Sequence, residues 1–480
     1  MIGSVAGLLT LAAGASMAAF ALAGIDMRYA LTFLAAVAAG DFLLYLGSWS
    51  RVQFALVASL ATGLSVGPGI TFFLHTSVSE SYLPFVGGAE GVTLSLALLS
   101  ALTYAGARAL SPAAPLLQIN WAIVVPQILF MAAGLVSLLA ARFPALTLLE
   151  EQRQLGLLFI CIVVMNLTAA EMATYQRALA WTVILQATLV GLQWSVGRPL
   201  GLSLLGEGAL LDQTTAVGQV ARPGGTFGDP NIAAYFFEIT GPTALLLALS
   251  LRRPSDRLLQ AAAAMAAFFG ALVTLSRGAW IALPLCSLLA LMCFLGRRAL
   301  QTRIALRLGG VALLAAIAAM AAWPFLSERL FGEDGGSTEH RIPLLKATWQ
   351  VLMSHGLIGI GLNNFAPTFE TADPSGYFRI FSGVNHVVHN LHLLVWTEVG
   401  TLGFAAYLSL FAMGWVTAYR LRNGQAAERA LAFGVGFGLL AHFLHGFVDP
   451  GFKLSLLISQ LVVAQFGVLA WLQLHHAARS

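Results

Sequence analysis

Apolar runs separated by short polar turns follow one another along almost the whole chain. A helix crosses the hydrocarbon part of a bilayer with about 20 apolar residues. Runs of this kind are predicted at residues 4–24, 29–49, 53–74, 92–110, 119–141, 155–173, 179–196, 230–251, 258–275, 279–295, 305–325, 390–418, 430–447 and 452–472. The pattern therefore predicts an all-α fold, a polytopic membrane bundle of about 12–14 transmembrane helices.

Two polar stretches interrupt this series of apolar runs. The longer one covers residues 326–388, and the shorter one covers residues 197–229. In the longer stretch, apolar residues recur at helical spacing and Pro343 suits the first turn of a helix. We expect an amphipathic helix at 340–354 that lies over the bundle, followed by an irregular loop at 363–388.

The composition excludes a water-soluble globular protein. Of 480 residues, 58% are hydrophobic and 10% are charged, and the mean hydropathy is +0.82. The three cysteines lie in apolar runs, which speaks against a disulfide framework or a zinc site. The formal net charge of +4 is spread over many loops, so no nucleic-acid partner is expected. Membrane lipids are the surroundings that this composition requires.

Arginines cluster in three of the polar turns and indicate the orientation of the chain. The three clusters are Arg252, Arg253 and Arg257; Arg297, Arg298, Arg303 and Arg307; and Arg420, Arg422 and Arg429. Because cytoplasmic loops are enriched in Lys and Arg, we place these turns in the cytoplasm. Residues 197–229, the tight turn Ser276–Gly278 and residues 326–388 then lie on the opposite side, called the outer side below. Met1–Ser4 contain no Lys or Arg, so the first apolar run is interpreted as a helix rather than a signal peptide.

Four short patterns of polar residues lie on the outer side. They are the run from Arg222 to Asn231, which reads Arg-Pro-Gly-Gly-Thr-Phe-Gly-Asp-Pro-Asn; the turn Leu275-Ser-Arg277-Gly-Ala-Trp280; Arg341 with Leu345 four positions later; and His389 with Gly400 eleven positions later. Together these patterns resemble the O-antigen ligase and polysaccharide polymerase superfamily of bacterial inner membranes.

The resemblance is confined to the second half of the chain and predicts two parts. Residues 1–196 are expected to form N-terminal transmembrane helices without a matched motif. Residues 197–480 are expected to form a ligase- or polymerase-like catalytic membrane region that includes a periplasmic loop at 326–388.

The resemblance also implies an activity and its partners. It implies a multi-pass protein of the bacterial inner membrane that transfers a glycan from undecaprenyl pyrophosphate to an acceptor hydroxyl, with the site facing the periplasm. The acceptor is a glycan or lipid A-core, and contact with other polysaccharide assembly proteins is expected. In this scheme arginines hold the lipid pyrophosphate, a histidine activates the acceptor, and the anomeric carbon is inverted. Because no acidic pair or cluster has metal-ligand spacing, we expect a metal-independent reaction and no cofactor.

Arg222 and Arg277 are predicted to hold the donor pyrophosphate. Both lie at the outer edges of helices, and a guanidinium group stays charged and forks to two phosphate oxygens. Asp229 and Pro230 suit the start of the next helix, whose free N–H groups are expected to add to the phosphate site. Asn231 is expected to bind pyrophosphate or sugar. The alternative is that the arginines snorkel to lipid headgroups and that the run is simply a turn.

His389 is the candidate general base, because a neutral imidazole accepts a proton near pH 7. It lies where the polar stretch enters the membrane, and Gly400 follows about three turns later on the same predicted helix face. His386 and His392 are rival histidines, and His392 is expected to orient His389. The alternative for His389 is a hydrogen-bonded structural role.

Further charged side chains are predicted to line the same site. Arg341 is expected to bind pyrophosphate or acceptor sugar, with a surface ion pair to Glu339 or Asp334 as the alternative. Glu238 and Glu398 lie inside apolar runs, where charges are costly, and each is expected to hold an arginine. Asp41 is a further charged residue inside an apolar run. His442, His445 and Asp449 lie near the outer end of the run 430–447 and are expected to line the same site.

The choice between a ligase and a polymerase stays open, with a slight preference for a polymerase of surface polysaccharide. The preference rests on the Gly-Thr-Phe-Gly-x-Pro-Asn run, which is similar to those of exopolysaccharide polymerases. A different class is a multi-spanning transporter or a flippase of lipid-linked oligosaccharide. A transporter is expected to line a path to both faces with polar residues. Here they gather on the outer side, which favours the enzyme.

Overall fold

The computed structural model describes residues 49–66, 72–75, 91–109, 116–215, 218–296, 337–372 and 387–477, together with the single residues 301, 320 and 327. Asp41, His386, the predicted run 4–24 and nearly all of the runs 29–49 and 305–325 lie outside the described residues. Of Arg341 only the backbone is described.

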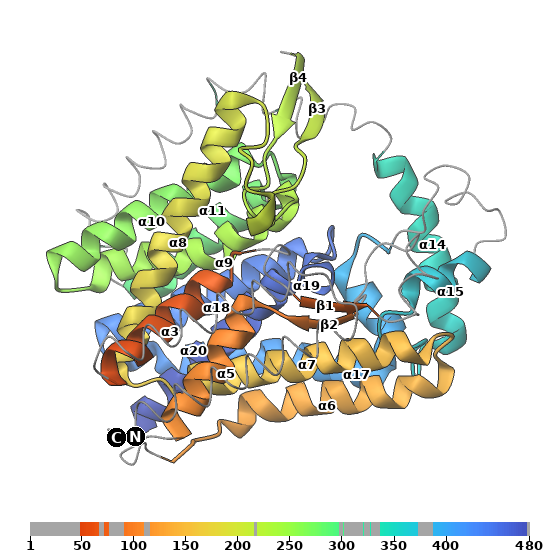
Figure 1. The fold of residues 1–480 in the computed structure, drawn as a ribbon, viewed down its shortest axis with the longest axis horizontal. Coiled ribbons are helices and arrows are strands. Elements are labelled where there is room, and N and C mark those ends of the chain that lie inside the picture. Colours follow the sequence, from red (N-terminus) through yellow and green to blue (C-terminus); the bar gives the residue numbers. More distant parts are fainter. Residues whose placement is uncertain are drawn as a thin grey trace, which may run out of the picture.

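Helices dominate the described part of the chain (Figure 1). They are α3 (Trp49–Gly63), α5 (Leu96–Ala109), α6 (Trp121–Ser137), α7 (Pro144–Met165), α8 (Ala169–Val196), α9 (Pro230–Ser250), α10 (Pro254–Val273), α11 (Arg277–Leu295), α14 (Ser337–His355), α15 (Phe365–Ala372), α17 (Leu391–Arg420), α18 (Ala426–His445), α19 (Gly451–Leu454) and α20 (Leu456–Ala477). Short 3-10 turns lie at Leu138–Ala140, Ser203–Leu205 and Leu421–Asn423. Two antiparallel hairpins pair β1 (Phe72–His75) with β2 (Gly91–Leu94) and β3 (Leu211–Thr215) with β4 (Gly218–Arg222).

Eight helices in the described part of the chain are long and apolar enough to cross a membrane. They are α6, α8, α9, α10, α11, α17, α18 and α20, some extended by an adjoining turn. Their outward faces are apolar: on α11, for example, Ile281, Leu285 and Leu288 lie exposed one above the other. Apolar stripes of this kind suit contact with lipid rather than water. The predicted all-α, polytopic membrane fold is confirmed.

Helix α9 lies near the centre of the bundle and packs against α10 and α18. Gly434 and Gly438 of α18 allow the close approach, because a Cβ at these positions would overlap Thr243 Cα and Ile239 O of α9. Helix α6 lies along α17, and α7 runs beside α6 and against α20 (Figure 1). Helices from both predicted parts of the chain therefore pack together.

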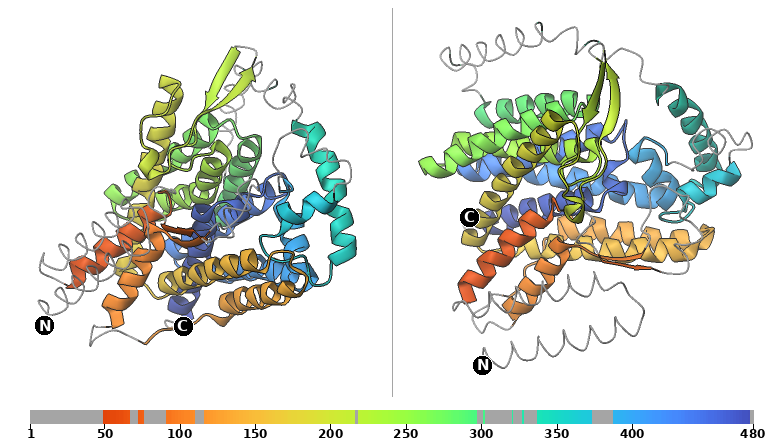
Figure 2. Two further views of the ribbon diagram at one scale, coloured as in Figure 1. Left: turned by 45° about the vertical axis from the view of Figure 1, so that its right-hand side comes forward. Right: turned by 45° about the horizontal axis from the view of Figure 1, so that its top comes forward.

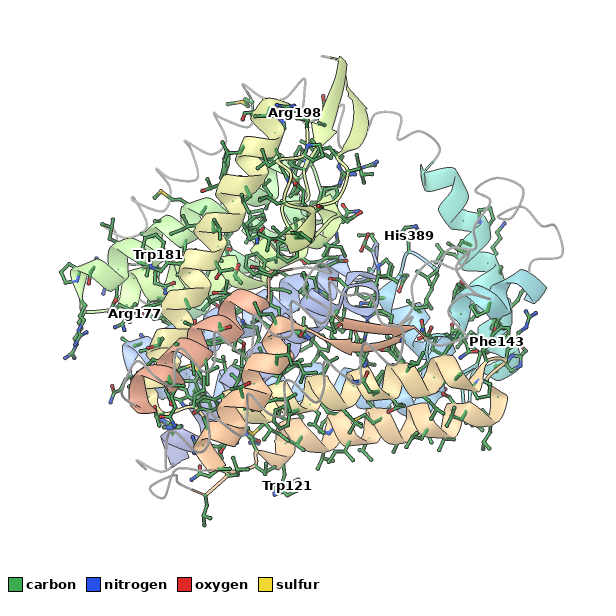
Figure 3. All side chains as sticks on the ribbon, in the orientation of Figure 1. Trp121, Phe143, Arg177, Trp181, Arg198 and His389 are labelled. Atoms are coloured by element: carbon green, nitrogen blue, oxygen red, sulfur yellow. The ribbon has the colours of Figure 1, made fainter. Side chains whose placement is uncertain are left out.

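One end of the bundle collects the polar segments that the sequence places on the outer side. At this outer end α9, α11 and α17 begin and α8, α10 and α18 end. The β3–β4 hairpin stands out from the helices there (Figure 2). Phe143, Arg198 and His389 mark the outer end in Figure 3, and Trp121 marks the opposite end.

The polar stretches are more ordered than the sequence predicts. Residues 197–229, expected as loop, contain the β3–β4 hairpin. Helix α14 already includes residues before Pro343, so this proline lies inside the helix rather than in its first turn. The expected irregular loop 363–388 contains α15, because Phe365 and Ala366 are buried against α14 in a small apolar core. Tertiary burial, which a local pattern does not reveal, stabilises this short helix.

Helix α17 is interrupted at Gly400, whose φ of 69° and ψ of −177° are not helical. The segment after α14 packs into this break: Thr401 N donates to Gly356 O at 2.8 Å, and Gly361 N donates to Glu398 O at 3.1 Å. A Cβ at Gly400 would overlap Leu357 O. The prediction that Gly400 continues a helix face from His389 is therefore wrong, because the helix breaks there to admit another backbone.

Replacing Gly400 by Ala is expected to destabilise the protein by at least about 1–2 kcal/mol. The positive φ alone costs an L-residue roughly this much, and the added methyl group collides with Leu357 O. The measurement is the thermal unfolding midpoint of the purified protein in detergent. The control is Gly106→Ala on α5, where a Cβ meets nothing within 4 Å and a small gain in stability is expected. An unchanged midpoint for Gly400→Ala would contradict this account.

Candidate functional site at the outer end

Arg222 joins two helical segments at the outer end. It lies at the end of β4, and its Nε donates to Thr274 O at 3.1 Å, in the turn between α10 and α11. Its Nη2 donates to Asn231 Oδ1 of α9 at 2.9 Å. Burial lowers the pKa of Arg222, and nearby Arg277 lowers it further, while Asp229 and Asp449 raise it. Neither hydrogen bond uses Nη1, so this edge of the guanidinium is not committed to Thr274 or Asn231.

The run that carries Arg222 is held by two amide side chains of α8. Gly225 N donates to Gln193 Oε1 at 2.8 Å, and Gln193 Nε2 donates back to Gly225 O at 3.2 Å. Gln186 Nε2 donates to Thr226 Oγ1 at 2.7 Å. These buried hydrogen bonds hold the backbone next to Arg222 in one conformation, so the run is anchored to α8.

The start of α9 confirms one expectation and overturns another. Asp229 caps the helix, since its Oδ1 accepts from Asn231 N at 2.7 Å and from Ile232 N at 3.1 Å, and Pro230 takes the first helical position as predicted. Ala233 N donates to Asp229 O. The first N–H groups of α9 are thus already bonded. The prediction that they bind phosphate is wrong for this conformation, because the cap that starts the helix also uses its donors.

Asn231 and Tyr235 tie α9 to the loop 446–450, which follows α18. Asn231 Nδ2 donates to Asp449 Oδ2 at 3.4 Å, and Tyr235 Oη donates to Asp449 O at 3.0 Å. Burial raises the pKa of the Asp449 carboxyl, and His445 opposes that shift. The chain Arg222–Asn231–Asp449 therefore connects the predicted donor side to this loop.

The same loop also holds the start of α17, next to His389. Leu391 N donates to Gly446 O at 2.7 Å, and Asn390 Nδ2 donates to Phe447 O at 3.1 Å. Asn390 caps the helix by accepting from Leu393 N. His389 is the residue just before this cap, half-buried, on the side of the bundle that faces α14 (Figure 3). The loop 446–450 thus brings the backbone of His389 and the Arg222–Asn231 pair to one end of the molecule.

Arg277 opens α11 directly after the tight turn that carries Thr274. Its charge acts on Arg222 across this turn. Two neighbouring guanidinium groups repel each other, and an anion between them relieves that repulsion. Arg341 lies in the first turns of α14. The two predicted donor arginines are therefore brought together, while the side chain of Arg341 and all of His386 lie outside what the structure describes.

Three predicted substrate-binding residues are instead engaged within the protein. His392 Nε2 lies 3.0 Å from Phe443 O, and its Nδ1 lies 3.2 Å from Tyr407 Oη, so neither ring nitrogen is directed to His389. Glu238 pairs with His445, and Glu398 pairs with Lys453; among the described side chains, no arginine forms an ion pair with either carboxylate. All are buried. These carboxylates satisfy partners on facing helices, which the sequence alone does not identify.

Lys453 is the centre of a buried ion network that the sequence analysis missed. Its Nζ lies 3.1 Å from Glu398 Oε2 of α17 and 3.2 Å from Glu150 Oε1 of α7. Arg153 also contacts Glu150, at 3.0 Å, and donates to Lys453 O. The signal was present: Glu150 and Arg153 adjoin a predicted span, and Lys453 lies inside one. Such charges need partners.

Among the residues that the structure describes, no group of three or more His, Cys, Asp and Glu side chains is placed to hold a metal ion. The expected independence of metals stays a prediction.

Residues 262–408 match the family model described as O-Antigen ligase. The match spans most of α10, all of α11, α14 and α15, and the first part of α17, and so includes Arg277, Arg341 and His389 but not Arg222. No curated protein matches the chain. Three of the four polar patterns lie inside this match, and the pattern at Arg222 lies outside it. The chain is thus a multi-pass membrane protein with an O-antigen ligase domain at 262–408, which supports the predicted O-antigen ligase and polysaccharide polymerase superfamily and a glycan-processing function of that type.

Proposed function

We propose that the protein transfers a glycan from undecaprenyl pyrophosphate to an acceptor hydroxyl on the periplasmic side of the bacterial inner membrane. The acceptor makes it either a polymerase of surface polysaccharide or an O-antigen ligase. The observation that carries the proposal is the placement of Arg222 and Arg277 beside one turn, at the end of the bundle where His389 precedes α17. The O-antigen ligase match over 262–408 supports the same reaction class.

The reaction needs a base for the acceptor and a stabilised leaving group. His389 takes the proton of the acceptor hydroxyl as the acceptor oxygen forms its bond to the anomeric carbon. The bond from that carbon to the pyrophosphate oxygen breaks, and its electron pair stays on the oxygen. Arg222 and Arg277 stabilise the charge that develops on the departing lipid pyrophosphate. Direct displacement of this kind inverts the anomeric centre.

One loop anchors both the donor side and the acceptor side of the proposed site. The loop 446–450 bonds to Asn231 on the donor side and to Asn390 next to His389. A rigid connection between leaving-group and acceptor sites holds the reacting atoms in line, and orientation of this kind is a large part of catalysis. The polymerase preference rests on the sequence of the run 222–231.

Purified protein in detergent is expected to transfer a glycan from an undecaprenyl-pyrophosphate-linked donor and to release undecaprenyl pyrophosphate. The reaction should persist in excess EDTA. Mass spectrometry of the lipid and glycan products measures both points. Loss of activity on chelation, restored by Mg²⁺ or Mn²⁺, would refute metal independence. Absence of any transfer with both glycan and lipid A-core acceptors would refute the proposed reaction.

The glycans of a deletion strain distinguish the two acceptors. Single repeat units that remain on an acceptor indicate a lost polymerase, and full-length polymer that accumulates on undecaprenyl pyrophosphate indicates a lost ligase. If both glycan pools stay normal and export of a solute fails, the protein is a transporter instead. Gel electrophoresis and mass spectrometry of cell-envelope glycans supply the measurement.

A further inference from the structure

A buried carboxylate–histidine pair lies directly beneath the two donor arginines. Glu238 of α9 is 0% exposed and His445 of α18 is 4% exposed, and Nδ1 of the histidine lies 2.9 Å from Oε2 of the carboxylate. Such a pair is costly to place in an apolar interior, and breaking it leaves a buried group without a partner. The bundle therefore holds the imidazole in one defined orientation.

The imidazole of His445 lies against the first turn of α11. A Cβ at Gly278 would overlap both Nε2 and Cδ2 of the ring, so only a glycine fits there. The ring also stacks on Tyr235, with centroids 4.3 Å apart. Gly278 follows Arg277 in the chain, so the ring that Glu238 orients sets where the backbone of Arg277 lies.

The two arginines lie close enough for the charge of Arg277 to act on Arg222. Arg222 is held by Asn231, near the start of α9. Glu238 lies about two turns further along the same helix. Helix α9 therefore reaches both arginines. It holds Arg222 directly through Asn231, and it acts on the turn of Arg277 through the Glu238–His445 pair.

We propose that Glu238 and His445 are positioning residues of the donor site, which set the separation between Arg277 and Arg222 to suit a diphosphate. This inference rests on the proposed function, since it assumes that the arginines hold the donor. A diphosphate presents two charged groups at a fixed spacing, and guanidinium groups at a matching spacing bind both. A misplacement of about 1 Å can cost roughly 100-fold in rate.

The test is a double-mutant cycle on Gly278 and His445. Gly278→Ala pushes the ring aside, and His445→Ala removes it, so each is expected to lower kcat/KM for an undecaprenyl-pyrophosphate-linked glycan by about 10- to 100-fold. The double variant should lose no more than either single one, because the ring that the methyl group at 278 would displace is then absent. KM for the acceptor should not change. Glu238→Gln, which keeps the shape of the side chain, should give a smaller loss of the same kind.

Matched controls separate positioning from folding and from the function itself. Glu171→Gln alters a buried carboxylate near the opposite end of the bundle, where Tyr104 Oη donates to it at 2.9 Å, and should keep the wild-type KM for the donor. Strictly additive losses in the cycle, or equal changes in donor and acceptor KM, would overturn the inference. If His445→Ala does not accumulate in membranes, Glu238→Gln decides: donor kinetics like those of Glu171→Gln overturn it. An active Arg277→Ala would instead refute the assignment of the donor site.

Discussion

Arg222→Ala and Arg277→Ala should each abolish glycan transfer while the protein still accumulates in the membrane. The two guanidinium groups supply positive charge where the departing pyrophosphate gains negative charge. Without Arg222, its acidic neighbours Asp229 and Asp449 would face the pyrophosphate without a compensating cation at that position. Arg222 also spans Thr274 and Asn231 by two hydrogen bonds. Transfer from a lipid-linked donor, measured with equal amounts of folded protein, checks the expectation.

Lysine at either position should restore only part of the activity. An ammonium group carries the charge but lacks the planar fork, so in Arg222→Lys the new side chain would not bond Thr274 O and Asn231 Oδ1 while it also faces a phosphate. A suitable control is Arg177→Lys near the opposite end, where the arginine bonds the Asp256 carboxylate in a partly exposed ion pair, and transfer should stay near wild type. Near-normal glycan chains from both alanine variants would exclude the two arginines as donor ligands.

His389→Ala should lower turnover by about 10² to 10⁴, the usual worth of general-base assistance. Donor binding should survive, because it depends on the arginines. Turnover and donor binding are measured separately, the second by competition with an unreactive lipid pyrophosphate. If donor affinity falls in step with the rate, His389 is a pyrophosphate ligand rather than the base.

Two neighbouring histidines provide the comparison for His389. His386→Ala should reduce turnover less. His392→Ala should mainly lower stability, because the ring is buried with contacts to Phe443 O and Tyr407 Oη. A dead His386→Ala together with a fully active His389→Ala would transfer the role of base to His386.

Local patterns were sufficient where short-range chemistry decides the structure. Apolar runs predicted the membrane helices, and Asp229 followed by Pro230 predicted the start of α9, since a cap is formed by residues next to each other in the chain. The Arg222 and Arg277 patterns predicted two arginines at one end, and the turn at Thr274 brings them together. These features depend on few long-range contacts.

Long-range packing decided what the sequence did not reveal. Glu238 and His445 are separated by 207 residues, and nothing local tells whether a buried glutamate faces an arginine, a lysine or a histidine. The sequence predicts that Gly400 continues a helix face from His389, but its positive φ depends on the segment 356–361 that enters the break. The sequence shows which residue types stand at these positions, but it does not show which residues they contact.

The ion network around Lys453 has a consequence for how the protein is made. The members of the network are synthesised in chain order: Glu150 and Arg153 with α7, then Glu398 with α17, and Lys453 only with α19. Until the ribosome has delivered α19, Glu398 lacks this cation, and the loop 446–450 that ties Asn231 to Asn390 is not yet anchored by it. This end of the bundle is therefore expected to complete its packing only after almost the whole chain has been synthesised.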